Sequence, residues 1–173
     1  MSLREFAEAL PDYAKDIRLN LNSLSSDQTL GDQRKYGLLL TTAHASGYKP
    51  LVDAAEAECA PKLSPEAANA ARAAAAVMAM NNVYYRFTHL ASNKEYATLP
   101  AKLRMNVIGN PGIDKADFEL FSLAVSAQNG CGMCMDAHEK VLKGHNVPAD
   151  VIQAAARFGA VMTAAATVHA TRV

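Results

Sequence analysis

The sequence contains no tryptophan, and aromatic residues make up only 6% of its 173 residues. Alternating runs of β-branched residues, which are typical of strands, are also missing, whereas alanine is abundant. This composition predicts an all-α protein. The length fits a single domain over residues 1–173, and half of the residues are apolar, which is enough for a substantial core.

Net charge is absent as well, because 17 Lys and Arg balance 17 Asp and Glu. No basic block stands out, so nucleic acid and anionic membranes have no electrostatic support as partners. We find no apolar run of transmembrane length, and residues 1–6 lack the apolar core of a signal peptide. We therefore expect a cytoplasmic protein with no membrane partner, whose low charge mildly favours self-association.

Cysteine is scarce, with only three residues. An odd count without an export signal argues against a framework of structural disulfides. Cys59 has no cysteine or histidine near it in sequence, so we interpret it as a small buried apolar residue. Cys131 and Cys134 are different, because a Cys-x-x-Cys pair can close and open a disulfide across one turn. Such a pair stores two electrons and indicates a thiol redox centre.

A histidine and a carboxylate flank the cysteine pair. His138 lies four residues after Cys134, and Glu119 lies twelve before Cys131. Gly130 is expected to end one helix and leave Cys131 at the start of the next, where the helix dipole lowers a thiol pKa. Cys134 and His138 share one helix face. The dipole favours Cys131 as the more acidic thiol and the histidine favours Cys134, so these residues leave the attacking thiol open.

The same glycine break predicts a helical hairpin. Glu119 would lie eleven residues before the turn and His138 eight after it, an axial mismatch of less than one helical turn of about 5.4 Å. Glu119 could then orient the imidazole or pass a proton to a thiol. For a lone glutamate, a solvated helix acid is the alternative interpretation.

Zinc is the competing occupant of this motif. Cys131, Cys134 and His138 offer three suitable ligands, but a closed structural site needs four. The sequence has no second Cys-x-x-Cys and no histidine pair to complete it. We therefore expect no metal.

Helix start and stop signals divide the chain. Helices are expected over residues 3–10, 12–21, 28–46, 50–59, 65–90, 115–129, 131–144 and 148–170. The clearest start is Ser64-Pro65-Glu66, with a capping hydroxyl, a proline at the first position and an acid in the first turn. The polar residues 23–27 are expected to form a loop, and residues 110–112 a turn. Three methionines in apolar helical stretches are expected to fill the core: Met78, Met80 and Met162.

The two halves, residues 28–92 and 114–171, look like copies of one unit. A shift of 83 residues aligns glycine, acid and proline positions at helix ends: Gly47 with Gly130, Asp53 with Asp136, Glu56 with Glu139, and Pro65 with Pro148. In the first copy, Tyr48 and Leu51 occupy the cysteine positions and Ala55 the histidine position. Only the second copy is therefore expected to carry chemistry.

The set Glu119, Cys131, Cys134 and His138 resembles the Glu-x11-Cys-x-x-Cys-x3-His centre of the AhpD family of alkyl hydroperoxide reductases. That family has the carboxymuconolactone decarboxylase-like helical fold. The resemblance extends along nearly the whole chain, through residues 10–17, 80–86, 103–106, 110–113 and 118–120. It implies a homotrimer in which Cys134 attacks, Cys131 closes a Cys131–Cys134 disulfide, and His138 with Glu119 relays protons.

The resemblance also implies partners. Members accept electrons from dihydrolipoamide on a dihydrolipoyl acyltransferase, which dihydrolipoamide dehydrogenase recharges, and pass them to the peroxiredoxin AhpC. They also reduce organic peroxides weakly and need no tightly bound cofactor. One position departs from some members, which have a histidine where this chain has Met133. Two alternatives are a general dithiol oxidoreductase without a peroxiredoxin partner and a helical binding module that holds zinc.

Overall fold

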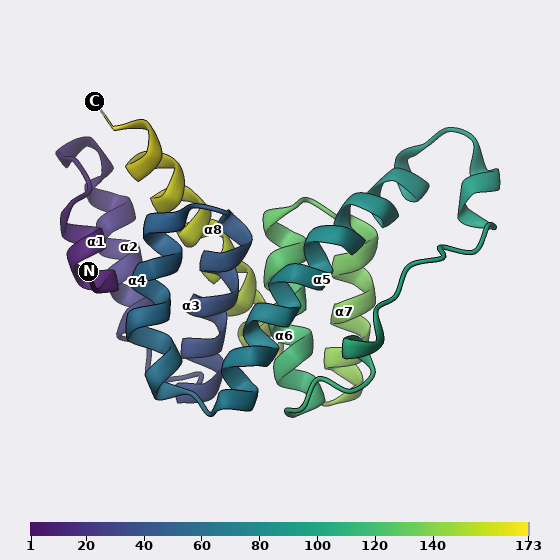
Figure 1. Cartoon of the computed structure of the whole chain (residues 1–173), viewed down its shortest axis with the longest axis horizontal. Coiled ribbons are helices and arrows are strands. Elements are labelled where there is room, and N and C mark those ends of the chain that lie inside the picture. The colour runs from purple at the N-terminus through teal and green to yellow at the C-terminus, as the bar shows by residue number, and fades with distance from the viewer. Residues whose placement is uncertain (173) are drawn as a thin grey trace.

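The computed structural model describes residues 1–172, and within them the chain is all-α, as the sequence predicts (Figure 1). Eight α-helices follow one another: α1 (Leu3–Glu8), α2 (Lys15–Ser25), α3 (Asp32–Ser46), α4 (Lys49–Cys59), α5 (Pro65–Leu90), α6 (Lys115–Gln128), α7 (Gly132–Gly144) and α8 (Ala149–Thr171). Short 3₁₀ helices lie between them: η1 (Asp12–Ala14), η2 (Ala60–Lys62), η3 (Lys94–Ala97) and η4 (Asn106–Ile108).

Side-chain caps fix the helix starts that the sequence indicates. The Ser64 hydroxyl accepts a hydrogen bond from the backbone N–H of Ala67 at the start of α5. The Asp114 carboxylate accepts one from the N–H of Ala116 at the start of α6. Each cap satisfies a backbone donor that has no partner within the helix. The predicted starts of these two helices are thereby confirmed.

The polar stretch predicted as a loop is largely helical, which corrects the sequence-based interpretation. Helix α2 continues to Ser25. The hydroxyls of Ser23 and Ser25 donate to the carbonyls of Leu19 and Leu21, at 3.0 and 3.1 Å. Serine side chains satisfied in this way fit within a helix instead of ending it. The predicted helix over 12–21 also differs, because its first turn is the 3₁₀ helix η1.

Helix α3 begins at Asp32, four residues later than predicted. The carboxylate of Asp27 accepts hydrogen bonds from the backbone N–H groups of Thr29 and Leu30, at 2.8 and 3.1 Å. Gly31 then has a φ of 76°, which a helix does not allow. The side chain of Asp27 thus holds the residues just before α3 in a turn, so that they do not form a first helical turn.

Helices α3 and α6 form the centre of the molecule. Residues 35–43 of α3 and 116–126 of α6 are all buried, because other helices pack on every side of the pair. The two helices cross closely at Gly37. A Cβ atom there would lie 2.1 Å from the ring of Phe121, so only glycine allows this approach.

The helix positions follow the 83-residue offset seen in the sequence. Helices α3 and α6 begin 83 residues apart, and so do α4 and α7. Gly47 and Gly130 have left-handed φ values of 66° and 65° at the ends of α3 and α6. Helix α5 packs on both central helices, and α8 does the same in the second half. These matches support the duplication, which stays an inference from the pattern.

A long arm separates the two halves. Figure 1 shows the C-terminal part of α5 and the segment that follows it extending away from the helical body before the chain returns to α6. Large apolar side chains along this arm are exposed to solvent: Val83, Phe87, Leu90, Tyr96 and Leu99. Phe87 and Tyr96 lie with their ring centroids 5.1 Å apart. The arm thus presents apolar surface that the single chain does not cover.

Helix α8 qualifies the expectation about membranes. By length and composition alone it could cross one, so the expected absence of any such run is wrong on that criterion. Half of its most apolar stretch is buried in the fold, as in the core helix of a soluble protein.

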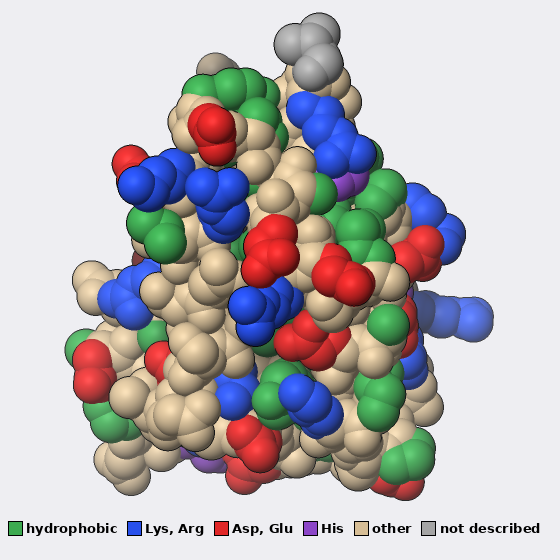
Figure 2. Space-filling model, turned by 90° about the vertical axis from the view of Figure 1, so that its left-hand side faces the viewer, with side chains coloured by type: hydrophobic (Ala, Val, Ile, Leu, Met, Phe, Trp, Pro, Cys, Tyr) green, Lys and Arg blue, Asp and Glu red, His purple; other side chains and the backbone are tan. Residues whose placement is uncertain are grey.

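Figure 2 shows acidic and basic side chains interspersed on the face that includes α1, α2 and α4.

Candidate active site

The two cysteines lie at the beginning of α7. Gly130, with its φ of 65°, ends α6 and turns the chain so that Cys131 becomes the N-terminal cap of α7. Cys131 and Cys134 form a disulfide. Both sulfurs therefore lie at a helix N-terminus, where unpaired N–H groups and the helix dipole stabilise a thiolate. The predicted helix start at the cysteine pair is confirmed.

The two cysteines differ in their access to solvent. Cys131 is completely buried, whereas Cys134 is 7% exposed and lines a cavity of about 230 Å³. Met133, between them in sequence, is 37% exposed at the edge of the same cavity. A ligand in this cavity would meet the sulfur of Cys134 first, an asymmetry that the sequence motif alone does not give.

Glu119 and His138 meet in the interior across the α6–α7 hairpin. Oε2 of Glu119 lies 2.6 Å from Nδ1 of His138, and both side chains are at least 90% buried. On the other side, Nζ of Lys115 lies 2.8 Å from Oε1 of Glu119. Lys115 is one helical turn before Glu119 on α6, so the carboxylate lies between a cation and an imidazole.

The environment of Glu119 keeps it ionised. Burial alone would raise the pKa of this carboxyl, because desolvation disfavours the charged form. The hydrogen bonds from His138 and Lys115, with their charges, outweigh burial, and the pKa is lowered from its usual value. Glu119 is thus a carboxylate that accepts hydrogen bonds, which corrects the alternative of a solvated helix acid.

Most of the cavity wall is apolar. It is lined by Met78, Asn81, Tyr85, Ile108, Met133, Cys134, Ala137 and His138. The polar groups among these side chains include His138 and the amide of Asn81, whose Oδ1 is buried without a hydrogen-bond partner. A cavity of this kind suits an organic molecule with one small polar group near Cys134.

A second hollow adjoins the first. It has a volume of about 510 Å³ and lies within the arm, between the end of α5 and the segment that follows it. Tyr85 and Met133 line both hollows, so the outer one leads towards Cys134. Its walls are more polar than those of the inner cavity and include Lys94 and His89.

Sequence reasoning missed two residues that contact the Glu119–His138 pair. Met78 was expected to fill the core, and it is buried, but its Sδ also lies 3.2 Å from Nε2 of His138. Lys115 was not singled out, although its spacing of four residues from Glu119 on one helix is a usable signal. For Met78 no local signal exists, because 60 residues separate it from His138.

The positions of the first half that align with the two cysteines and His138 carry no thiol. Leu51 and Ala55 are buried, and the hydroxyl of Tyr48 forms a 2.8 Å hydrogen bond with Nδ1 of His169. Cys59 is buried too, and desolvation raises its pKa to about 12. The interpretation of Cys59 as a buried apolar residue is confirmed, and its thiol is unreactive at neutral pH.

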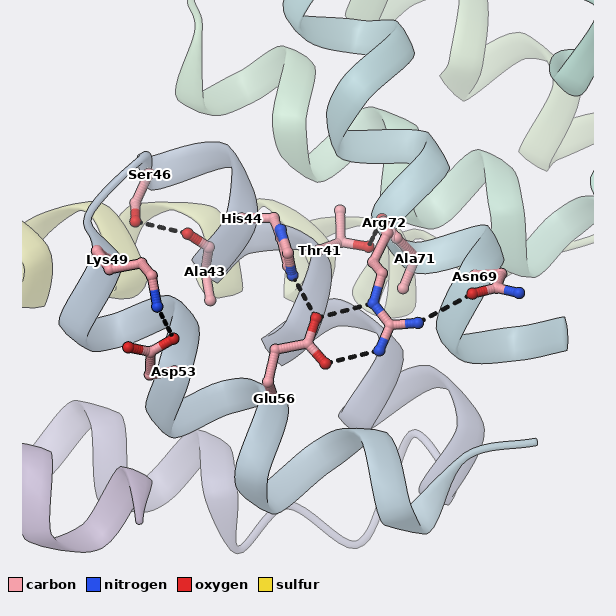
Figure 3. Close-up of polar contacts among 10 residues, drawn as sticks. All are labelled: Thr41, Ala43, His44, Ser46, Lys49, Asp53, Glu56, Asn69, Ala71 and Arg72. Atoms are coloured by element: carbon pink, nitrogen blue, oxygen red, sulfur yellow. Dashed lines mark hydrogen bonds and ion pairs between the residues drawn. The ribbon is translucent and has the colours of Figure 1, made fainter. Parts of the chain in front are cut away.

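A different polar cluster ties the first half together (Figure 3). Glu56 of α4 accepts hydrogen bonds from Nε and Nη2 of Arg72 on α5, at 2.8 and 2.6 Å. Its Oε1 also lies 2.6 Å from Nε2 of His44 on α3. Hydrogen bonding to Arg72 is the largest effect on this carboxyl and lowers its pKa to about 2, against the opposing effect of burial. The cluster joins α3, α4 and α5, none of which carries Cys131 or Cys134.

The described part of the chain contains no set of side chains arranged to bind a metal ion. Within residues 1–172, no group of three or more His, Cys, Asp or Glu side chains is placed to hold an ion. Cys131 and Cys134 are joined to each other in this state, so neither offers a free thiolate.

The fold and the site define a helical protein with a Cys-x-x-Cys redox centre beside a buried carboxylate–histidine pair. Residues 94–173 match the model of the carboxymuconolactone decarboxylase family. The chain is 79% identical to the alkyl hydroperoxide reductase AhpD of Rhizorhabdus wittichii over the full length of both chains. It is 63% identical to that of Rhodopseudomonas palustris, over 96% of this chain and 92% of the relative.

A third relative agrees with these two. The alkyl hydroperoxide reductase AhpD of Hyphomonas neptunium is 61% identical over 98% of this chain and 94% of its own length. Identity at this level over nearly whole chains establishes the family. The chain belongs to the AhpD family.

Proposed function

We propose that this protein is a lipoyl-dependent alkyl hydroperoxide reductase with an antioxidant role, and that its Cys131–Cys134 pair carries the electrons. The observation that carries the proposal is that Cys134 borders an apolar cavity shared with His138, whose imidazole is paired with the buried carboxylate of Glu119. The names of the relatives support the same reaction.

The oxidative half uses the reduced dithiol. Glu119 and His138 take the proton of Cys134, and the thiolate attacks the terminal oxygen of a hydroperoxide. The O–O bond breaks, the alcohol leaves with a proton returned from His138, and Cys134 becomes a sulfenic acid. The thiol of Cys131 then attacks this sulfur, a water leaves, and the disulfide closes.

The reductive half uses dihydrolipoamide as the electron donor. A donor thiolate attacks the sulfur of Cys134, which the cavity makes accessible, and Cys131 leaves. The second donor thiol then attacks its own sulfur in the mixed disulfide, and Cys134 is released. The outer hollow, which leads to the inner cavity past Met133, suits the long carrier arm of a dihydrolipoyl acyltransferase. Dihydrolipoamide dehydrogenase would recharge that arm.

The peroxiredoxin AhpC is the proposed main acceptor. Its disulfide would be attacked by Cys134 in the same way as a peroxide, so the protein links the lipoyl donor to AhpC. We also propose a cytoplasmic homotrimer. The exposed apolar side chains of the arm, including Phe87 and Leu90, support self-association, because another copy of the chain would remove them from water.

A coupled assay tests the function. NADH oxidation would be followed with dihydrolipoamide dehydrogenase, lipoamide and an organic hydroperoxide, with and without AhpC. We expect turnover that AhpC amplifies, that Cys134→Ser loses and that the matched control Cys59→Ala keeps. Turnover independent of AhpC would favour the general dithiol oxidoreductase. Absence of turnover in every combination would contradict the proposal, and metal analysis of the reduced protein would then test the zinc-binding module.

A further inference from the structure

The imidazole of His138 is held at both of its nitrogen atoms. Nδ1 lies 2.6 Å from Oε2 of Glu119, and Nε2 lies 3.2 Å from Sδ of Met78. No hydrogen bond joins the ring to Cys131 or Cys134 in this disulfide state. The histidine therefore rests between a carboxylate on α6 and a thioether on α5.

Both of these partners are hydrogen-bond acceptors. A carboxylate accepts only, and the lowered pKa of Glu119 keeps it ionised, so Nδ1 must donate to it. A thioether sulfur has no proton and is a weak acceptor, so a 3.2 Å approach of Nε2 is favourable when that nitrogen also carries a proton. Together, the two contacts fit the doubly protonated imidazolium.

The sulfur of Met78 is surrounded by donors, which a packing role alone does not require. Besides Nε2 of His138, Oγ of Ser126 lies 3.8 Å and Nδ2 of Asn82 3.9 Å from Sδ. Nδ2 of Asn82 in turn donates to Oγ of Ser126 at 2.9 Å. Met78 is 1% exposed, so its sulfur is shielded from bulk solvent. The sulfur thus has a fixed polar environment in an otherwise apolar wall.

We propose that Met78 is a positioning residue that holds His138 in its doubly protonated form while the disulfide is closed. The ring then already carries a proton before the donor reopens the disulfide. The Cys134 thiolate released in that step takes up this proton. That last step rests on the proposed function, whereas the protonation state does not. The donor dithiol loses two electrons and two protons, and the disulfide gains the electrons. Cys134 receives its proton from Nε2 across the cavity that both side chains line, Cys131 takes up one donor proton, and the second donor proton goes to the solvent, from which the imidazole is reprotonated after each disulfide closes.

The other ionisable groups around the ring are few. Helix α6 contributes Glu119, which favours the imidazolium, and Lys115, which opposes it but is paired with the same carboxylate. Helix α5 contributes Tyr85, and α7 contributes Cys134, which is in the disulfide. From η4, the apolar side chain of Ile108 faces the cavity. Met78 is therefore the neighbour that interacts with Nε2 without a charge of its own.

Nuclear magnetic resonance of the oxidised protein tests the protonation state. Nitrogen shifts of the His138 ring in wild type, assigned by their loss in His138→Gln, should have the imidazolium pattern at pH 6. Met78→Leu conserves volume and removes the acceptor, so the titration midpoint of His138 should fall by about half a pH unit. Met162→Leu, a buried core methionine on α8, is the matched control and should leave the midpoint unchanged.

A second variant separates the acceptor from packing. Met78→Gln supplies an amide oxygen to Nε2 and should return the midpoint towards the wild-type value. A His138 ring that is neutral at pH 6 in wild type would overturn the proposal, and this result needs no variant to fold. An equal midpoint in wild type and folded Met78→Leu would overturn it as well.

Kinetics then test the use of the proton. The rate of disulfide reduction by dihydrolipoamide in Met78→Leu is divided by the wild-type rate at each pH, which cancels the ionisation of the donor. This ratio should be near one at low pH and fall to about one third above the wild-type midpoint, since half a pH unit is about threefold. A ratio lowered equally at every pH would mean a structural role and contradict the proposal. Failure of dihydrolipoamide to reduce wild type would count against the proposed function and leave the resonance result standing.

Discussion

The carboxylate of Glu119 and the imidazole of His138 lie 2.6 Å apart, although 19 residues and a complete helix reversal separate them in the chain. The glycine turn at Gly130 produces this contact, because it folds α7 back along α6 with the two side chains at a similar height. The pair is buried, and His138 lines the same cavity as Cys134. We propose that this pair, and not the cysteine pair alone, gives the site its proton relay.

Removal of the imidazole tests this relay. His138→Phe should lower peroxide turnover roughly 100-fold or more, because general acid–base catalysis typically contributes that much. The apparent pKa of the attacking thiol should rise, as measured by the pH dependence of iodoacetamide labelling in the reduced protein. His145→Phe, at the exposed end of the same helix, is the control and should change neither. An unaltered thiol pKa in His138→Phe would remove His138 from the relay.

The two cysteines should have unequal roles. Cys134→Ser should abolish turnover, because the sulfur that borders the cavity is gone. Cys131→Ser should instead trap Cys134 as a mixed disulfide with AhpC, since no resolving thiol remains. Mass spectrometry of the AhpC reaction distinguishes the two variants. Full activity of Cys134→Ser would end the assignment.

A substitution at Met133 should raise the reactivity of the Cys134 thiol. Met133→His places a titratable ring one residue before Cys134, at a position already exposed to the cavity. We expect faster alkylation of Cys134 at neutral pH, because a nearby imidazolium stabilises the thiolate. Met133→Leu is the matched control for loss of the thioether. A pH–rate profile for iodoacetamide that matches wild type would count against the prediction.

The cluster in Figure 3 should govern acid stability instead of catalysis. The folded pKa of Glu56 is about 2, below the usual value of 4.5, so its stabilising effect is complete above pH 4.5 and is lost as pH falls towards 2. Arg72→Met should cost roughly 1–3 kcal/mol of unfolding free energy at pH 7. It should also flatten the pH dependence between 4.5 and 2, as measured by urea unfolding.

The exposed neighbouring ion pair of Lys49 with Asp53 supplies the control. Lys49→Met should change the unfolding free energy by less than about 1 kcal/mol, since surface pairs contribute little. An equal effect of Lys49→Met and Arg72→Met would mean that the Glu56 cluster has no special role.

Local chemistry in the sequence predicts much of this molecule. The hydroxyl cap at Ser64 and the carboxylate cap at Asp114 define the starts of two long helices. The glycine break between Glu119 and His138 predicts that these two side chains meet. Where the sequence-based prediction is wrong, a side chain competes with the backbone. The Asp27 carboxylate takes N–H groups that a helix would use, and the Ser23 hydroxyl fits within a helix.

Other features depend on packing between distant segments and have no local signature. The sulfur of Met78 reaches His138 because α5 packs against α7, and nothing near either residue in sequence indicates it. The access of Cys134, and not Cys131, to a cavity depends on the walls that Ile108 and Tyr85 supply from elsewhere in the chain. The direction of the arm is likewise a property of the folded molecule.

The most direct test of the account is a single turnover of the fully reduced protein with one equivalent of cumene hydroperoxide and no electron donor. We expect one cumyl alcohol per chain, a fall from three free thiols to one, a Cys131–Cys134 disulfide in the peptide map, and Cys59 still reduced. Unconsumed hydroperoxide, or an oxidised Cys134 beside a free Cys131 thiol, would contradict it.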